Sequence, residues 1–314
     1  MEGIAFSFGW EVSLMIWIQD LVDRMGSLGV PLAWVLTELG EETILVAFMG
    51  FLYWSYDKEL GKKVGCIIMA ALVFNPMVKN LVLRRRPYFD HGEIRCLRPV
   101  DPDYDIYDLS GQGFSFPSGH STNATVVYAA LPVYQRGGKV LKILAVVMPL
   151  LVGISRCMLG VHYPTDVLCG WIMGTLLLMV ISALQKRVSR RYLHMVLFLI
   201  ACLGLFYCKT ADYYTAIGSM AGFFLTIPFE EKFVKFENTR KPIWMILRVL
   251  GGFAVYVGCN TLLKLPFSAE FLESGTMIAL LVRSARYLLV MFVMMGVYPM
   301  LFKLEKRLRK KTQE

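Results

Sequence analysis

Three short segments of the sequence combine cationic, histidine and acidic side chains at regular spacing. The first is KNLVLRRRP, in which Lys79 stands seven residues before Arg86. Seven residues make about two helical turns, so both cations lie on one face of a helix, and Pro87 disfavours helix at Arg86 and ends it there. This pair can bind an anionic group, whereas Arg84 and Arg85 face elsewhere and are expected to reach towards lipid phosphates.

The second segment is PSGH, residues 117–120, which stands directly before an apolar segment. Ser118 and Gly119 therefore mark the N-terminus of a helix, where unpaired N–H groups and the helix dipole favour an anion. Gly119 lets the backbone approach such an anion closely, and His120 lies in the first turn. His120 is either a proton donor to a bound group or an ordinary histidine at the membrane interface.

The third segment is SRCMLGVHYPTD, residues 155–166. Arg156 ends one apolar segment, and Pro164 suits the first turn of the next helix. Asp166 follows His162 by four residues, so its carboxylate can accept a hydrogen bond from one ring nitrogen and leave the other nitrogen free to attack. An acidic residue at the membrane edge is costly and usually functional.

Together the three segments supply cations and N–H donors for the oxygens of a phosphoryl group, a nucleophile and a proton donor. Two of the four histidines of the chain lie in them. These are the parts that phosphoryl transfer requires where no metal ion takes part. The seven cysteines are odd in number and form no CxxC pair, so we expect neither a metal site nor a disulfide framework.

Membrane-spanning helices must position these segments, because the chain is mostly apolar. It has 314 residues, of which 56% are hydrophobic and 18% are charged, whereas about a quarter of the residues of a soluble domain are charged. Apolar runs of about 15 to 25 residues are long enough to cross or nearly cross a bilayer. The net charge of +9 fits basic cytoplasmic loops better than nucleic-acid binding.

The sequence predicts an all-α, polytopic bundle of transmembrane helices in three regions. Residues 1–40 form interfacial N-terminal helices, 41–186 form the catalytic core, and 187–314 form accessory spans with a basic tail. The N-terminal segment EVSLMIWIQDLVDRMG mixes apolar and acidic residues, as in a helix that lies in the membrane interface. The predicted spans are 41–56, 63–83, 120–135, 140–156, 164–184, 192–208, 212–229, 243–264 and 277–302, with a half-helix at 28–38.

Charge also predicts the orientation of the chain in the membrane. Lysine and arginine gather in alternate loops, near residues 58–63, 136–142, 186–191 and 232–241, and in the C-terminal segment KLEKRLRKK. Basic loops stay in the cytoplasm, so the C-terminus is predicted to be cytoplasmic. The three segments described above then open on the extracytoplasmic side, at the level of the lipid headgroups.

The three segments match, in order and spacing, the signature of the type 2 phosphatidic acid phosphatase superfamily, which the chain resembles across residues 79–166. The pattern is K-x6-RP, then PSGH, then SR-x5-H-x3-D, and no position departs from it. The resemblance implies a membrane lipid phosphatase that needs no metal ion and no cofactor. It places the catalytic core within residues 41–186.

The resemblance also implies a role for each matched residue. His162 would form a phosphohistidine, Asp166 would orient it, and His120 would protonate the leaving group. The other matched residues would bind the phosphate, namely Lys79, Arg86, Ser118, Gly119 and Arg156. Water would then release phosphate from the intermediate.

The substrate is indicated less clearly. Residues 39–65 resemble a stretch of the sphingosine-phosphate phosphatases, whereas the N-terminal region is similar to that of undecaprenyl-diphosphate phosphatases. Phosphatidate, phosphatidylglycerophosphate, a polyprenyl diphosphate and a sphingoid-base phosphate are therefore all candidate substrates. Two alternatives stay open: a lipid phosphotransferase that passes the phosphoryl group to an acceptor hydroxyl, and a non-catalytic binder or transporter of lipid phosphates.

Residues 187–314 carry no catalytic motif. They are expected to form a packing or homodimerisation module, or to wall a cleft for the lipid tail. Arg283 and Arg286 either point outwards, pair with Glu270 or Glu273, or contact the substrate headgroup. Two pairs of glycines have the spacing of closely packed helices: Gly170 and Gly174, and Gly218 and Gly222.

Overall fold

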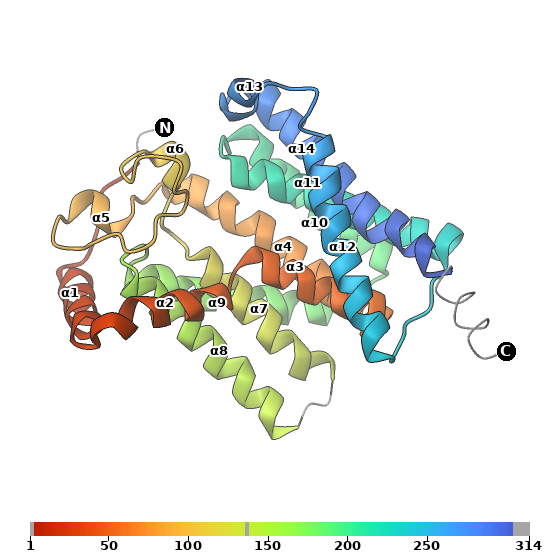
Figure 1. Ribbon diagram of the computed structural model, residues 1–314, viewed down its shortest axis with the longest axis horizontal. Helices are drawn as coiled ribbons and strands as arrows, with labels where there is room; N and C mark the ends of the chain where they lie inside the picture. Colours follow the sequence, from red (N-terminus) through yellow and green to blue (C-terminus); the bar gives the residue numbers. More distant parts are fainter. Residues whose placement is uncertain (1–2, 136–137, 304–314) are drawn as a thin grey trace. The chain divides into compact units, whose positions relative to one another are not determined.

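The computed structural model describes residues 3–135 and 138–303, and Figure 1 labels its helices. Within these ranges the chain contains no strand, and an isolated backbone bridge joins Ile4 to Arg84. The predicted all-α class is therefore confirmed. Two parts of the orientation argument, Arg136 and the basic C-terminal tail, lie outside the described residues.

The longer helices agree with the predicted segments. Their bounds are α1 Gly9–Arg24, α2 Gly29–Glu38, α3 Glu42–Phe51, α4 Lys58–Val82, α7 Gly119–Tyr134, α8 Lys139–Met158, α9 Pro164–Leu184, α10 Arg190–Cys202, α11 Ala211–Phe229, α12 Pro242–Leu262 and α14 Met277–Phe292. Short helices lie in the loops: α5 Pro87–Asp90, α6 Leu109–Gln112 and α13 Ala269–Glu273. Each predicted span overlaps one of the longer helices, and the predicted half-helix at 28–38 corresponds to α2.

The chain divides into two compact units. The first comprises Met1–Leu45 and Phe74–Lys186, and the second comprises Val46–Val73 and Arg187–Glu314. These units are defined by contacts, so the predicted division at residues 40 and 186 into an interfacial, a catalytic and an accessory region stays a prediction. The three signature segments, at residues 79–87, 117–120 and 155–166, lie wholly in the first unit.

In the first unit, α7 packs against both α8 and α9. A Cβ atom at Gly170 or Gly174 of α9 would come within 2.7 Å of a backbone oxygen of α7, that of Ser118 or of Thr122. Glycine at both positions therefore permits a very close approach of the two helices, as its spacing predicts. This contact holds the start of α7, and with it the PSGH segment, against α9.

The N-terminal helices α1 and α2 pack against α8 in the same unit. One face of α1 is buried and carries Glu11, Met15, Gln19 and Val22. The opposite face exposes large apolar side chains, those of Trp10, Leu14, Trp17 and Leu21. This helix therefore buries a partly polar face in the protein and exposes an apolar face, and its position in the membrane interface stays a prediction.

In the second unit, α11 packs along α14, α10 packs against α11, and α12 packs against α14. Gly218 lies at the contact of α11 with α14, where a Cβ atom would come within 2.1 Å of the backbone oxygen of Ser284, and Gly222 makes a similar contact. Gly65 of α4 packs closely on Phe223 of α11. The absence of a side chain at Gly65 thus lets the first half of α4 lie close to α11 within this unit.

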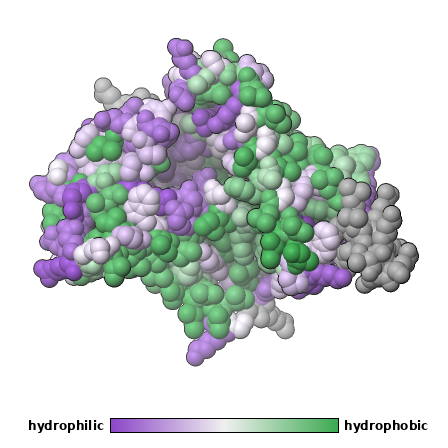
Figure 2. Space-filling view, in the orientation of Figure 1, coloured by the Kyte–Doolittle hydropathy of each residue, from purple (hydrophilic) through white to green (hydrophobic). Residues whose placement is uncertain are grey.

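Five segments among the described residues are long and apolar enough to cross a membrane: α4, α8, α9, α12 and Met277–Leu301. Of the other predicted spans, α3, α7 and α10 have only 10, 16 and 13 residues. Figure 2 shows a mainly hydrophobic surface over α8 and a mainly hydrophilic one over α5 and α6. The chain is therefore an integral membrane protein.

Candidate active site

His162 lies buried in the turn that joins α8 to α9. Gly160 shapes this turn, because its φ of +76° favours glycine and a Cβ atom there would come within 2.1 Å of the backbone oxygen of Arg95. The Nε2 atom of His162 lies 3.4 Å from Nη1 of Arg86, and its Nδ1 atom lies 3.6 Å from Oδ2 of Asp166. The two ring nitrogens therefore face a cation and an anion.

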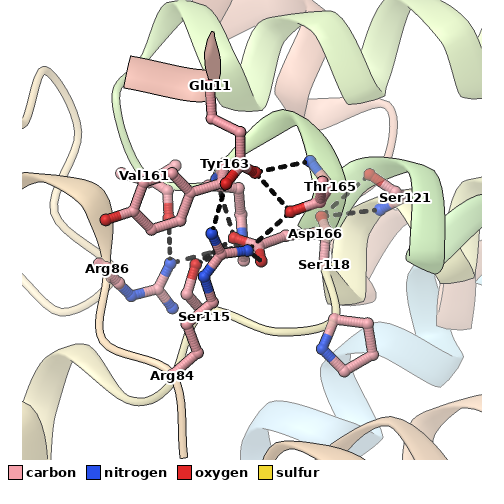
Figure 3. Close-up of polar contacts among 12 residues, drawn as sticks. Glu11, Arg84, Arg86, Ser115, Ser118, Ser121, Val161, Tyr163, Thr165 and Asp166 are labelled. Carbon is pink, nitrogen blue, oxygen red and sulfur yellow. Dashed lines mark hydrogen bonds and ion pairs between the residues drawn. The ribbon is translucent and has the colours of Figure 1, made fainter. Parts of the chain in front are cut away.

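Asp166 is buried in the first turn of α9, and both of its carboxylate oxygens accept hydrogen bonds (Figure 3). Oδ1 accepts one from Nη1 of Arg84 at 2.7 Å, and Oδ2 accepts one from the backbone N–H of Tyr163 at 2.8 Å. The hydroxyl of Ser115 donates to Oδ2 and lies 3.4 Å from Nδ1 of His162. Ser115 therefore bridges the two residues, which are slightly too far apart for the direct hydrogen bond that the sequence predicts.

Arg84 corrects an expectation from the sequence. Instead of reaching towards lipid, its side chain is fully buried and forms an ion pair with Asp166. Leu83 has a φ of 58°, so the chain leaves the helical path directly before Arg84 and the side chain turns into the protein. The neighbouring Arg85 is half-exposed and pairs with Asp90.

The two cations of the first segment lie in different surroundings. Arg86 is buried, and its guanidinium group donates hydrogen bonds to the backbone oxygens of Gln112 and Val161 at 2.7 and 2.8 Å. These bonds fix the guanidinium group beside His162. Lys79 lies in the last turn of α4 and is half-buried.

Burial and neighbouring cations lower the pKa of His162 well below its ordinary value. Burial is the main cause, and the positive charges of Arg86, Arg156 and Lys79 act in the same direction. The neutral imidazole carries the lone pair that attacks a phosphorus atom. The lowered pKa therefore favours the neutral form of His162, in which an imidazole can act as a nucleophile.

Arg156 is buried at the C-terminal end of α8, as the sequence predicts for a residue that ends this helix. Its Nη1 atom donates a hydrogen bond to Oγ1 of Thr37 in α2 at 2.7 Å. Its buried Nε atom has no hydrogen-bond partner among the described residues. Because an unpaired buried donor is costly, this N–H group is well suited to bind an oxygen of a ligand.

The start of α7 lies beside Asp166. Ser118 caps this helix by accepting a hydrogen bond from the backbone N–H of Ser121, and its own backbone N–H donates to the backbone oxygen of Asp166 at 3.0 Å. A Cβ atom at Gly119 would meet the side chain of Asn75, whose Oδ1 and Cγ atoms lie at 3.4 and 3.9 Å. Packing alone therefore does not require glycine at this position, which leaves close approach to a ligand as the better reason for it.

His120 is paired with an acidic residue that the sequence prediction omits. Its Nε2 atom lies 2.9 Å from Oε2 of Glu41, which stands between α2 and α3. The hydrogen bond with His120 lowers the pKa of Glu41 against the opposite effect of burial, and the charges of Arg156 and Arg98 also lower it. Burial and the positive charge of Arg156 disfavour a protonated His120, and the ionised Glu41 acts against both effects. Glu41 therefore supports the protonated form, which is the form that a proton donor needs.

Ser115, Glu41 and Arg84 are the residues of this site that the sequence analysis does not identify. Glu41 can be recognised in the sequence as a candidate, because an acidic residue at the edge of an apolar segment is costly and usually functional. Ser115 stands two residues before the PSGH segment, and nothing in its type or spacing distinguishes it from a loop serine. Arg84 resembles any other arginine at the end of a span.

The other predicted features lie outside this cluster. Among the described residues, no three His, Cys, Asp or Glu side chains are grouped as metal ligands would be, and the cysteines are free. Arg283 and Arg286 lie on α14 of the second unit, where Arg286 is buried and donates to Oδ1 of Asn260 at 2.9 Å. Its partner is therefore an amide rather than Glu270 or Glu273.

Comparison with known proteins agrees with the signature on which this site is built. The family described as PAP2 superfamily matches residues 61–190, and a PAP2 superfamily phosphatase transmembrane extension matches residues 214–310. A decaprenylphosphoryl-5-phosphoribose phosphatase of Mycobacterium tuberculosis is 33% identical over 168 residues, which are 52% of this chain and 84% of that protein. The chain belongs to the PAP2 superfamily. The extension accounts for most of the C-terminal half, for which the sequence offers no motif.

Two further relatives of this PAP2 protein are also phosphatases. Phosphatidylglycerophosphatase B of Bacillus subtilis is 44% identical over 101 residues, or 29% of this chain and 48% of that protein. An undecaprenyl-diphosphatase of Sulfolobus acidocaldarius is 27% identical over 145 residues, or 45% of this chain and 63% of that protein. The chain thus spans about half the length of the Bacillus relative. No solved structure matches it.

Proposed function

We propose that this PAP2 protein is a lipid phosphatase that hydrolyses a lipid phosphate or diphosphate through a phosphohistidine, without a metal ion. The position of His162 supports this function most directly, because its Nε2 atom lies 3.4 Å from Arg86 and its Nδ1 atom faces Asp166. A nucleophilic nitrogen beside a fixed cation lies where an anionic phosphoryl group is attracted. The names of the relatives support a lipid phosphate as the substrate class.

In the first step of the proposed reaction, Nε2 of His162 attacks the phosphorus atom. An N–P bond forms, the P–O bond to the leaving alcohol or phosphate breaks, and His120 gives its proton to the leaving oxygen. Asp166 and Ser115 hold the Nδ1–H group and stabilise the positive charge of the ring. The oxygens of the phosphoryl group are bound by Lys79, Arg86, Ser118, the amide of Gly119 and Arg156.

In the second step, water attacks the phosphohistidine. His120, now neutral, accepts a proton from the water molecule, the P–N bond breaks, and inorganic phosphate leaves. Both histidines return to their starting forms, so the cycle needs no other reactant. Burial and nearby cations favour the neutral form of His162. This form favours both steps, because a neutral imidazole is the attacking group in the first step and the leaving group in the second.

We assign the site to the extracytoplasmic face and the C-terminus to the cytoplasm. The basic loops near 186–191 and 232–241 support this orientation, since such loops stay in the cytoplasm. A fluorescent protein fused to the C-terminus checks the assignment in intact bacterial cells. Fluorescence of the fusion is expected, whereas a fusion that is made in full length but stays dark would contradict the orientation.

The experiment that tests the proposed function is phosphate release by the full chain purified in detergent. The substrates are phosphatidate, phosphatidylglycerophosphate, undecaprenyl diphosphate and a sphingoid-base phosphate, each with chelator and each beside a His162→Ala variant. We expect release that resists the chelator and is lost in the variant. The substrate that is hydrolysed fastest then names the lipid class.

Three other outcomes would contradict the proposal in different ways. Equal activity of His162→Ala would remove His162 from the reaction. Transfer of the phosphoryl group to an added alcohol, without free phosphate, would make the protein a phosphotransferase. Binding of the lipid without turnover, by the parent chain and the variant alike, would make it a lipid-phosphate binder.

For the second unit we propose contact with the substrate, through Arg283 rather than Arg286, because Arg286 is buried and bonded to Asn260. An Arg283→Gln variant should raise KM for the preferred lipid and leave hydrolysis of p-nitrophenyl phosphate unchanged. Equal kinetics of variant and parent on the lipid would leave this unit with packing or homodimerisation as its function. Sedimentation of the purified protein reports the dimer separately.

A further inference from the structure

A residue far from the signature is connected to the catalytic carboxylate. Glu11 lies on the buried face of α1, outside the matched family region of residues 61–190, and its side chain is fully buried. Its Oε2 atom lies 2.8 Å from Nη2 of Arg84. The Nη1 atom of Arg84 lies 2.7 Å from Oδ1 of Asp166. Figure 3 shows this continuous chain of polar contacts from α1 to the active site.

Arg84 is held in one orientation from several sides. Its Nε atom donates to the backbone oxygen of Phe6 at 3.0 Å, and its Nη1 atom also donates to Oγ1 of Thr165 at 2.7 Å. Its guanidinium carbon lies 3.9 Å from the ring centre of Tyr163 and 4.5 Å from that of Phe6. An arginine that stacks on rings and pairs with two carboxylates cannot be replaced by a lysine without loss of several of these contacts.

Glu11 completes the arrangement on the side away from Asp166. Its Oε1 atom accepts hydrogen bonds from the hydroxyl and the backbone N–H of Thr165, the residue next to Asp166. The backbone N–H of Phe8 donates to its Oε2 atom at 2.9 Å. One carboxylate therefore fixes both the guanidinium group that holds Asp166 and the backbone from which Asp166 projects.

The backbone before α1 lies beside residues 83–85 and forms hydrogen bonds with them. The N–H of Ile4 donates to the oxygen of Leu83 at 2.7 Å, and the N–H of Arg85 donates to the oxygen of Ile4 at 3.0 Å. The N-terminal segment thus borders Arg84 on both sides in sequence. The Arg84 side chain is the one that pairs with Glu11 and Asp166, whereas the half-exposed Arg85 side chain pairs with Asp90.

We propose that Glu11 and Arg84 are positioning residues, through which the N-terminal helix sets the orientation of Asp166 and hence of the His162 ring. The proposal rests on the proposed phosphohistidine reaction, since it concerns the rate at which His162 attacks. Neither residue touches the substrate. Their removal should therefore lower kcat and leave KM nearly unchanged, because a nucleophile that is displaced by less than 1 Å can lose about a hundredfold in rate.

The test compares Glu11→Gln with Asp23→Asn in the purified full chain, with the substrate that the parent hydrolyses fastest. Asp23 is a matched control, because it is also a carboxylate of α1 paired with an arginine, Arg95, but this pair is half-exposed and does not lead to Asp166. Glu11→Gln should lower kcat about tenfold at a KM within about twofold of the parent. Asp23→Asn should match the parent in both constants.

Two variants of Arg84 extend the test. Arg84→Lys should keep part of the activity, because a lysine can pair with one carboxylate but not with both. Arg84→Gln leaves two carboxylates buried without their cation and is at risk of not folding. The double variant Glu11→Gln/Arg84→Gln removes one of these charges, and should have the kcat of Arg84→Gln rather than the product of the two single losses, because the residues act in series.

The outcomes separate this proposal from the proposed function. If the parent hydrolyses no lipid, or His162→Ala is as active as the parent, the proposed function fails. If the parent is active and His162→Ala is not, an unchanged kcat in Glu11→Gln overturns the positioning role. Equal losses in Glu11→Gln and Asp23→Asn would also overturn it, because they would show a general effect of α1 on folding.

Discussion

The hydroxyl of Ser115 donates to Oδ2 of Asp166 and lies 3.4 Å from Nδ1 of His162. Nδ1 of His162 and Oδ2 of Asp166 are themselves 3.6 Å apart, so Ser115 provides the shorter polar contacts between the two residues. Its hydroxyl can rotate to donate to either neighbour. The link from His162 to Asp166 therefore passes through a residue that the family signature does not include.

Replacement of Ser115 by alanine should lower kcat about tenfold, because a mispositioned nucleophile loses rate without a loss of substrate binding. Ser110→Ala is the matched control, since Ser110 bonds to Asp108 in an exposed part of the same loop. The measurement is steady-state hydrolysis of the preferred lipid by each variant. A kcat of Ser115→Ala equal to that of Ser110→Ala would show that Asp166 orients His162 without help.

The acid limb of the pH profile should lie below the usual range of a histidine. Protonation removes the lone pair of His162, so activity is lost as the pH falls through its pKa. Burial and the cations Arg86, Arg156 and Lys79 lower that pKa, which moves the loss to more acidic pH. We expect kcat/KM to change little between pH 7 and about pH 6. A halving near pH 6.5, the unperturbed value, would contradict this electrostatic account.

Glu41→Gln should lower the rate of hydrolysis most for substrates whose leaving group needs a proton. The hydrogen bond with His120 holds the pKa of the Glu41 carboxyl group below its ordinary value, and the resulting carboxylate stabilises the protonated imidazole of His120. Without it, hydrolysis of an alkyl lipid phosphate should fall about tenfold, because a general acid contributes about a hundredfold or more. p-Nitrophenyl phosphate, whose leaving group needs no proton, should be hydrolysed at nearly the parental rate. An equal loss on both substrates would argue against His120 as the acid.

Gly170→Ala should destabilise the first unit and lower activity together. The new methyl group would come within 2.7 Å of the backbone oxygen of Ser118, so α7 must move away from α9 at a cost of about 1–3 kcal/mol. Gly258→Ala on α12 is the control, because nothing lies within 4 Å of a Cβ atom there and alanine favours helix by about 0.5–1 kcal/mol. Thermal unfolding in detergent should give a lower midpoint for the first variant only.

The sequence predicts those parts of the molecule that depend on local pattern. Apolar runs predict the helices, and glycine spacing predicts that α9 and α11 each pack closely on another helix. The structure identifies those partners as α7 and α14. The signature named His162, Arg86 and Arg156, which lie together because each stands at the end of a helix or in the adjoining turn. In these cases the residue type and its neighbours in sequence carry the information.

The remaining features depend on contacts between distant segments, which no local pattern reports. Arg84 and Arg85 are adjacent and alike in sequence, yet one is fully buried and the other is half-exposed. The positive φ of Leu83 turns the backbone so that the Arg84 side chain points into the protein. A leucine in the sequence does not predict a positive φ. The first half of α4 is one more such case, because Gly65 fits against Phe223, a residue 158 positions away in sequence.

The contacts of Glu11 also bear on the order in which the protein is made. Its hydrogen bonds to Thr165 span 154 residues, so the ribosome has delivered α1 long before the start of α9 exists. During that interval Thr165 cannot donate to the Glu11 carboxylate, although Arg84 and the backbone N–H of Phe8 are already available to it. The N-terminal helix therefore reaches its final packing only when the start of α9 has been made, which is also the stage at which Asp166, the residue next to Thr165, is added.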